Sequence, residues 1–313
     1  MRSRKHPHHV SISIGVVIAS GAWGVYWLPQ RALFDAGMTG AWATIAQFGL
    51  CLAIFSPVAL YRKIKGLPVG FDQPSVGLLI GGGIVCYSNA FLLTDVVRVL
   101  VFFYLTPVWA TLFELAFLKI RPGLARAASL GLGLCGAWVV LGGEGGLPLP
   151  QNLGDWLAVA SGIMMAAGAA RSHSIQPEGM FSLQWAYFFY GSVVAVAQIP
   201  LLSDVLGPAP MLDAWIHSLP LLLPLAFLFL IPSNAMLILS PSRIGAGLFS
   251  ILILSELVIG AISAALFADE PFGWREAIGC SLIVLAGLTE VFLARGAFSH
   301  SPRAPILPDT KTP

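Results

Sequence analysis

Residues 96–118 read VVRVLVFFYLTPVWATLFELAFL, and this stretch decides which class of protein the chain belongs to. Only Arg98 and Glu114 carry charge among its twenty-three residues. A helix rises about 1.5 Å per residue, so a helix of this length crosses the ~30 Å hydrocarbon core of a bilayer. Pro107 stands in its middle, where a soluble helix would break. In lipid an unpaired backbone is costly, so the stretch predicts a transmembrane helix that kinks at the proline.

The composition of the whole chain leads to the same class. Its 313 residues are 57% hydrophobic and only 10% charged, and the mean hydropathy is +0.83. Soluble domains are about a quarter charged, so a soluble globular protein is excluded. The four cysteines lie singly in apolar runs, which predicts neither disulfides nor a metal site, and no cofactor is expected. These cysteines are Cys51, Cys86, Cys135 and Cys280.

The apolar segments predict an all-α integral membrane protein with ten transmembrane helices. The expected spans are 10–34, 38–61, 75–95, 96–118, 123–143, 153–173, 181–203, 217–240, 244–268 and 274–294. With this count, fourteen of the seventeen Lys and Arg residues fall on the side of the N-terminus. Lys and Arg are retained on the cytoplasmic side, so both termini are predicted in the cytoplasm.

Three basic residues fall on the outer side, and each has acidic residues close to it in the sequence. We expect local ion pairs there. The expected pairs are Arg31 with Asp35, Arg98 with Asp95, and Arg275 with Asp269, Glu270 or Glu276.

The two halves of the chain repeat short motifs in the same order. Ala19-Ser20-Gly21 recurs as Ala160-Ser161-Gly162, and Ser88-Asn89-Ala90 recurs as Ser233-Asn234-Ala235. We therefore expect two repeats of five helices at 10–143 and 153–295, followed by a disordered cytoplasmic tail at 296–313. Because five is odd, the second repeat enters the membrane inverted relative to the first. Inverted repeats are typical of alternating-access transporters, whose substrate site lies near the midplane between them.

Several short motifs in the predicted spans carry small residues, prolines and acidic residues. They are Ser20-Gly21-Ala22-Trp23-Gly24, Leu105-Thr106-Pro107-Val108-Trp109, Ser255-Glu256-Leu257, Asp269-Glu270-Pro271-Phe272, and the glycines Gly279 and Gly287. These motifs resemble the drug/metabolite transporter superfamily, in its form with two EamA-type domains. The resemblance implies the inner membrane of a bacterial-type cell, a central cavity between the repeats, and a small metabolite, such as an amino acid, as substrate. Leu257 replaces a proline usual in the ninth helix, which is therefore expected to be straighter, and Ile120 replaces a glutamate.

One ionisable residue is expected at the middle of the membrane. Glu256 lies thirteen residues after Arg243 and thirteen before Asp269. A carboxyl at that depth is costly, so it is a candidate for function. It either lines the pathway or is a structural group hydrogen-bonded to Ser255 or Ser263. Two further intramembrane glutamates, Glu114 and Glu290, lie near the inner side and are expected to be structural.

The remaining candidates are amides, aromatic rings and one cation. Each could contact the substrate, and each has a structural alternative: helix packing for the amides and rings, and local pairing for the cation. These candidate substrate-binding residues, beside Glu256, are Trp23, Asn89, Arg98, Tyr104, Pro107 and Asn234.

The expected function is that of a secondary transporter that exports a small metabolite. No P-loop motif occurs, so the substrate gradient or protons would drive it. The expected partners are the small-molecule substrate, the lipid bilayer and protons, with no nucleic acid, in a monomer or homodimer. The alternatives are an intramembrane enzyme and a non-transporting receptor or scaffold. An enzyme is not expected, because no histidine lies in the middle of a predicted span.

Overall fold

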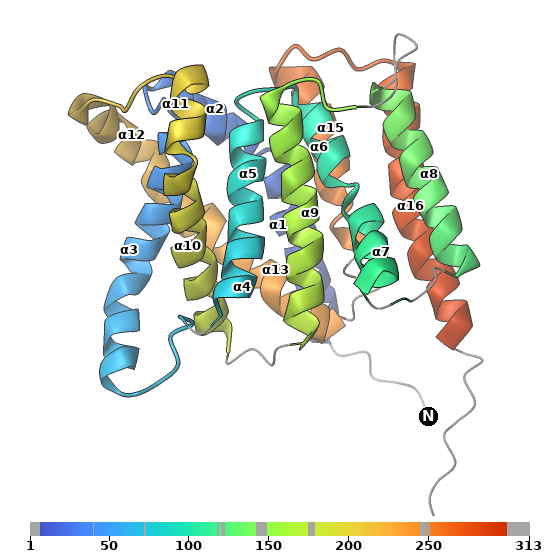
Figure 1. The fold of residues 1–313 in the computed structure, drawn as a ribbon, viewed down its shortest axis with the longest axis horizontal. Coiled ribbons are helices and arrows are strands. Elements are labelled where there is room, and N and C mark those ends of the chain that lie inside the picture. The colour runs from blue at the N-terminus through green and yellow to red at the C-terminus, as the bar shows by residue number, and fades with distance from the viewer. Residues whose placement is uncertain are drawn as a thin grey trace, which may run out of the picture.

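The structure is a computed structural model that describes residues 7–39, 41–71, 73–117, 119, 123–141, 149–174, 179–244, 249 and 251–298. The described residues form helices joined by turns, with no strand among them. Figure 1 shows these helices packed side by side in one bundle, in which α16 ends at the lower side.

The N-terminal half of the described chain runs from α1 to α8. Its elements are α1 (Pro7–Gly24), α2 (Trp27–Asp35), α3 (Trp42–Ile64), α4 (Pro74–Val76), the π-helical segment η1 (Gly77–Gly81), α5 (Gly82–Ala90), α6 (Val96–Phe103), α7 (Thr106–Phe117) and α8 (Leu124–Leu141).

The C-terminal half runs from α9 to α16. Its elements are α9 (Leu153–Ser174), α10 (Met180–Ala197), α11 (Ile199–Leu206), α12 (Leu212–Pro224), the π-helical segment η2 (Leu225–Leu230), α13 (Ile231–Ile244), α15 (Ser255–Phe267) and α16 (Trp274–Phe298). The tail expected from 296 begins inside α16, and residues 299–313 lie outside the described part, as do Ile120 and most of the junction between the halves.

The helices of the described chain are apolar enough for a multi-pass membrane protein. Five are long enough to cross a bilayer: Val10–Asp35, Trp42–Ile64, Val96–Phe113, Met180–Ala197 and Leu212–Ser240. Three shorter apolar helices accompany them at Arg126–Leu141, Leu153–Ala169 and Ser255–Phe267. The all-α membrane class expected from composition is confirmed.

The kink predicted at Pro107 is confirmed as a break between α6 and α7. The backbone leaves the helix at Tyr104 and Leu105, and α7 begins at Thr106. Proline has no N–H to donate, so the carbonyl of Phe103 loses its partner in the helix. The hydroxyl of Thr106 donates to that carbonyl at 2.5 Å instead.

A second break lies where a straighter helix was expected, and that expectation is wrong. The backbone leaves the helix at Ile253 and Leu254, directly before α15. The carbonyl oxygen of Ile253 accepts hydrogen bonds from the hydroxyls of Ser20 and Tyr104, both at 2.8 Å. The same carbonyl also accepts from the backbone N–H of Glu256 at 3.1 Å, which closes a tight turn at this point. The two hydroxyls add to that bond where the backbone turns, so no proline is needed for the break.

Glycine allows the close crossing of α1 and α15. A Cβ added to Gly24 would lie 2.5 Å from the carbonyl oxygen of Glu256 and 2.8 Å from the nitrogen of Gly260. The missing side chain therefore brings the two backbones together, as small residues do between membrane helices. This crossing fixes the start of α15 against the first helix.

Candidate functional site

The carboxyl of Glu256 lies between the two broken helices. Its Oε1 accepts a hydrogen bond from the hydroxyl of Tyr87 on α5 at 2.6 Å, and its Oε2 accepts one from Tyr104 at 3.2 Å. Both donors belong to the N-terminal half, whereas Glu256 begins α15 in the C-terminal half. The carboxyl therefore joins the two halves at the centre of the molecule.

The serines named as possible partners of Glu256 bond elsewhere. Ser255 donates to the carbonyl of Leu252 at 2.8 Å, and Ser263 donates to that of Gly260 at 2.9 Å. Serine in a helix bonds readily to a carbonyl of the preceding turn, so these hydroxyls are satisfied within their own segment.

We call Ser20, Tyr87, Tyr104, Ile253 and Glu256 the Glu256 cluster. Three hydroxyls converge there on one carboxyl and one carbonyl. Among the ion pairs of the described residues, none involves Glu256. Neutral hydroxyl donors stabilise a carboxylate less than a cation does, so the arrangement suits a carboxyl that gains and loses a proton.

The two candidate amides, Asn89 and Asn234, connect helices. Asn89 accepts from the hydroxyl of Thr44 at 2.6 Å and donates to the amide oxygen of Gln198 at 2.7 Å. Asn234 donates to the amide oxygen of Gln184 at 2.5 Å. These bonds join α5 to α3 and to the end of α10, and α13 to α10. The geometry accords with the helix-packing alternative for both residues.

Trp23 packs in a group of buried aromatic rings. Its ring centroid lies 4.9 Å from that of Tyr26 and 5.0 Å from that of Phe229 on η2. The hydroxyl of Tyr26 bonds to Gln47 at 2.7 Å and to Ser88 at 3.0 Å. The indole nitrogen of Trp23 is buried and has no hydrogen-bond partner in the described part of the chain. A buried donor without a partner is costly, so this N–H is free to bind an acceptor.

Pro107 and Tyr104 line a small cavity between the α6–α7 break, α8 and α16. Its volume is about 50 Å³. Metabolite sites occupy roughly 300–1,000 Å³, so this space cannot hold a substrate.

Arg98 pairs with Asp155 and not with Asp95, which corrects the expected local pair. Its Nε lies 3.1 Å from Oδ1 of Asp155, and its Nη2 lies 2.5 Å from Oδ2. Asp155 lies in the first turn of α9 and is fully buried, whereas Asp95 is exposed. Packing of α6 against α9 brings this distant acid closer to the guanidinium than the neighbouring one.

The other two outer arginines also have unexpected partners. Arg31 pairs with Glu270 at 3.5 Å and not with Asp35. Arg275 donates to the carbonyls of Val139 and Val140 on α8 at 3.3 and 3.2 Å, and it forms no ion pair with another described residue. Proximity in sequence does not predict the partners of these arginines, because each guanidinium points from its own helix toward a neighbouring element.

The comparisons with known proteins agree with this architecture. Residues 10–142 match the model of the EamA-like transporter family. One solved crystal structure of a protein is similar in fold, with a TM-score of 0.57 and 18% sequence identity. The similarity covers 94% of this chain and 99% of the chain in that structure. At this identity the likeness shows a shared fold alone. No curated protein matches the chain significantly.

Proposed function

We propose that this chain, whose residues 10–142 match the model of the EamA-like transporter family, is a secondary transporter that exports a small metabolite such as an amino acid. The observation that carries the proposal is the Glu256 cluster, in which hydroxyls of one half hold a carboxyl of the other between two broken helices. Broken helices at the midplane are the usual place of substrate and ion sites in transporters.

Glu256 supplies the coupling to protons in this proposal. A carboxyl inside the membrane without a cationic partner is costly to ionise, so its proton exchange is tied to the opening of the site to water. When the site faces outside, Glu256 takes a proton as substrate leaves. When the site faces inside, Glu256 releases the proton and substrate binds again.

Two features support the arrangement as two inverted five-helix repeats, at 10–143 and 153–295. The π-helical segments η1 and η2 occupy the third predicted span of each half. The breaks at Tyr104 and Ile253 occupy the fourth predicted span of each half. Both pairs fall at matching places, as duplication of one five-helix unit would produce, and π-helical turns are frequent at functional sites.

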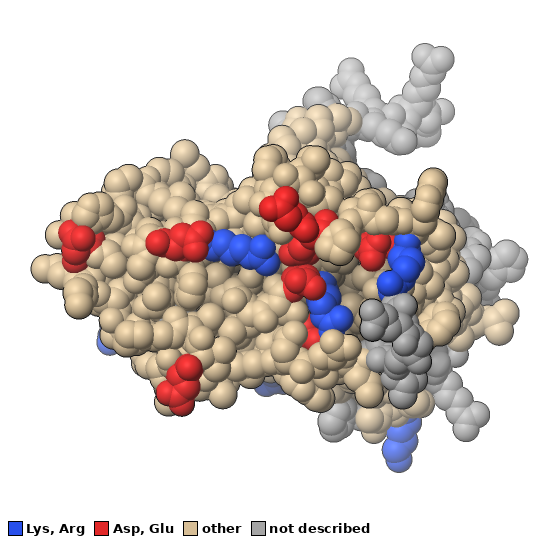
Figure 2. All heavy atoms as spheres, turned by 90° about the horizontal axis from the view of Figure 1, so that it is seen from above, with Lys and Arg blue, Asp and Glu red and all other residues tan. Residues whose placement is uncertain are grey.

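The distribution of charge supports both termini in the cytoplasm. Figure 2 views the upper face of Figure 1 and shows acidic side chains beside a few basic ones. Arg62, Lys63 and Lys65 follow one another at the opposite end of α3. Since basic residues stay on the cytoplasmic side, we place the upper face outside and the inner end of α3 in the cytoplasm.

Cysteine labelling tests this orientation. In a variant without native cysteines, Met211→Cys before α12 should react with an impermeant thiol reagent added to intact spheroplasts, whereas Leu67→Cys after α3 should react only after lysis. Both native side chains are exposed, so burial does not distinguish them. The reverse labelling pattern would rule out the orientation.

Counterflow in proteoliposomes tests the function itself. Vesicles that contain purified protein and unlabelled amino acids should accumulate radiolabelled amino acid above equilibrium, because an exchanger couples inward to outward movement of one substrate. A metabolite screen that compares export by deletion and overexpressing cells selects the substrates to load. Chemical turnover without flux would support an intramembrane enzyme instead, and neither flux nor turnover across the screened substrates would favour a receptor or scaffold.

A further inference from the structure

A second polar network joins the two halves at the outer side, above the Glu256 cluster. In its first arm the carboxylate of Asp155 binds the guanidinium of Arg98 through two contacts. The same carboxylate accepts from the hydroxyl of Thr94 at 2.9 Å and from the backbone N–H of Gln151 at 2.9 Å. The Asp155 side chain is 0% exposed and that of Arg98 is 17% exposed, so water competes little for this pair.

The second arm is built on Glu270, in the turn after α15. Its carboxylate accepts from the backbone N–H groups of Val96 at 2.7 Å and Val97 at 3.1 Å, which begin α6. A negative charge at a helix N-terminus is favourable because the free N–H groups and the helix dipole point toward it. Arg31 approaches the same carboxylate at 3.5 Å and donates to the carbonyl of Phe91 at 3.1 Å.

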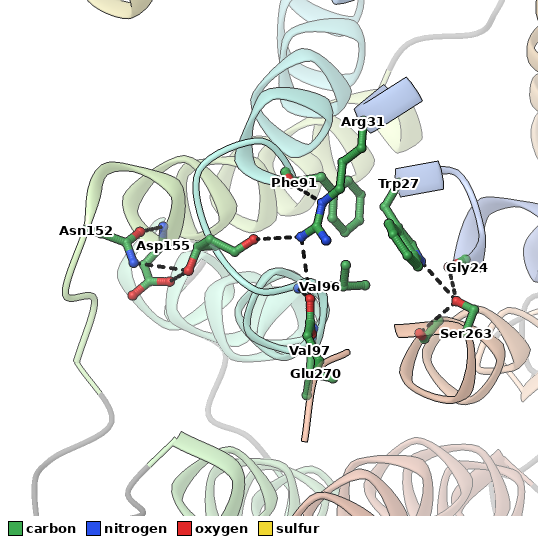
Figure 3. A network of polar contacts seen from close by, with 12 residues as sticks. Gly24, Trp27, Arg31, Phe91, Val96, Val97, Asn152, Asp155, Ser263 and Glu270 are labelled. Carbon is green, nitrogen blue, oxygen red and sulfur yellow. Dashed lines mark hydrogen bonds and ion pairs between the residues drawn. The ribbon is translucent and has the colours of Figure 1, made fainter. Parts of the chain in front are cut away.

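Trp27 connects this second arm to α15. The guanidinium of Arg31 lies 4.9 Å from the ring of Trp27, whose indole N–H donates to Ser263 on α15 at 2.9 Å. Figure 3 shows the two carboxylates on different sides of the start of α6, with Arg31 extending toward Glu270 and Trp27 toward Ser263 on α15. The outer ends of α2, α6, α9 and α15 are thereby held together.

Both arms contact the N-terminal end of α6. Tyr104, which follows the C-terminal end of α6, belongs to the Glu256 cluster. Asp155 and Glu270 come from the C-terminal half, whereas residues 94–98 belong to the N-terminal half. Helix α6 is only eight residues long, and Tyr104 directly follows it and donates to Glu256. A movement that releases the start of α6 is therefore passed to the cluster through one short rigid helix.

We propose that Asp155 and Glu270 are the gating residues that close the transporter to the outside, through the Arg98–Asp155 and Arg31–Glu270 pairs, which we call the outer latch. This inference rests on the proposed function, because only alternating access requires the outer side to open and close. Substrate leaves when both pairs separate, and the site turns inward when they form again. Neither acid was singled out as a site residue by the sequence.

Accessibility of a buried thiol from outside tests the latch. Ser88 is a suitable reporter position, because it is fully buried on α5, one turn below the carbonyl of Phe91 that Arg31 binds. In a variant without native cysteines, Ser88→Cys should react slowly with impermeant thiol reagent outside spheroplasts. Asp155→Asn and Glu270→Gln should each raise the rate about tenfold, since loss of one ion pair shifts a two-state equilibrium by that order.

Non-additivity distinguishes the ion pair from a general loss of structure. The double variant Arg98→Gln with Asp155→Asn should increase the labelling rate by less than the two single variants combined, because both remove the same ion pair. Arg275→Gln is the matched control: it removes an arginine on the same face whose bonds within the described part of the chain are to carbonyls of α8, and it should leave the rate unchanged. Each variant should elute as a single species from a sizing column.

The outcomes separate the latch from the proposed function. Labelling requires no transported substrate, so faster labelling in a protein without counterflow would keep the latch and overturn the transporter. Slow labelling in well-folded latch variants that still show counterflow would overturn the latch alone. Equal acceleration by Arg275→Gln would also overturn it, because the effect would then belong to any charge lost from the outer face.

Discussion

Glu256→Gln is expected to fold and insert like the parent protein, to exchange substrate across proteoliposomes, and to lose accumulation driven by a pH gradient. Glutamine keeps the shape of the side chain, and its amide oxygen still accepts one hydroxyl bond, but it cannot bind and release a proton. The hydroxyl of Tyr87 donates to Glu256 at 2.6 Å, whereas that of Tyr104 lies closer to the carbonyl of Ile253, at 2.8 Å, than to Glu256, at 3.2 Å, so Tyr104 keeps an acceptor in the variant. Uptake of radiolabelled substrate, with and without a pH gradient, measures both activities.

Glu276→Gln is the matched control for this substitution. Glu276 lies in the first turn of α16 and accepts from the backbone N–H of Gly273 at 2.7 Å, far along the chain from the broken helix. The same chemical change there should leave proton-driven accumulation intact. If Glu256→Gln still accumulates substrate in response to a pH gradient, Glu256 has a structural role and the proposed proton coupling through this carboxyl is wrong.

Gly24→Ala is expected to lower both stability and transport. The added methyl group would meet the carbonyl of Glu256 and the nitrogen of Gly260, which are backbone atoms and cannot turn away. Overpacking of this kind costs about 1–3 kcal/mol, and the displacement of α15 would also move Glu256 from its hydroxyl donors. The unfolding temperature in detergent and the rate of counterflow should therefore both be lower than in the parent protein.

The same change from glycine to alanine is expected to have the opposite effect on stability at Gly49. Gly49 lies inside α3, and a Cβ there would meet no atom within 4 Å. Alanine in a helix interior is favoured over glycine by roughly 0.5–1 kcal/mol, so this variant should unfold at a slightly higher temperature with unchanged transport. If both variants lose stability equally, the close crossing of α1 and α15 is not the cause.

Local patterns in the sequence predicted the helical segments and one of the two breaks. Apolar runs give the spans because the bilayer demands length and satisfied backbone groups, and Pro107 gives a break because its ring removes a donor. The break at Ile253 could not be predicted in this way. It involves hydroxyls of Ser20 and Tyr104, which lie far away in the sequence and reach the carbonyl only after folding.

Partners of charged residues were the least predictable feature of the site. Glu256 was singled out from its predicted depth in the membrane. Its partner Tyr87 was missed, because a single tyrosine in an apolar span has no sequence signal that separates packing from binding. One signal did exist for Asp155. The side-chain oxygen of Asn152 accepts a hydrogen bond from the backbone N–H of Asp155 at 2.9 Å, which caps the start of α9. An asparagine three residues before an acid is typical of a helix start. That pattern places Asp155 at the outer edge, where Arg98 was also expected.

The most direct test of alternating access is labelling of the Glu256 cluster from each side of the membrane. Ser20→Cys, in a variant without native cysteines and reconstituted in one orientation, places a thiol beside the carbonyl of Ile253. An impermeant thiol reagent should reach it from outside and from inside in separate experiments, and latch variants should favour the outside. Reaction from one side only, in the parent and in the latch variants alike, would contradict a site that alternates between the two sides.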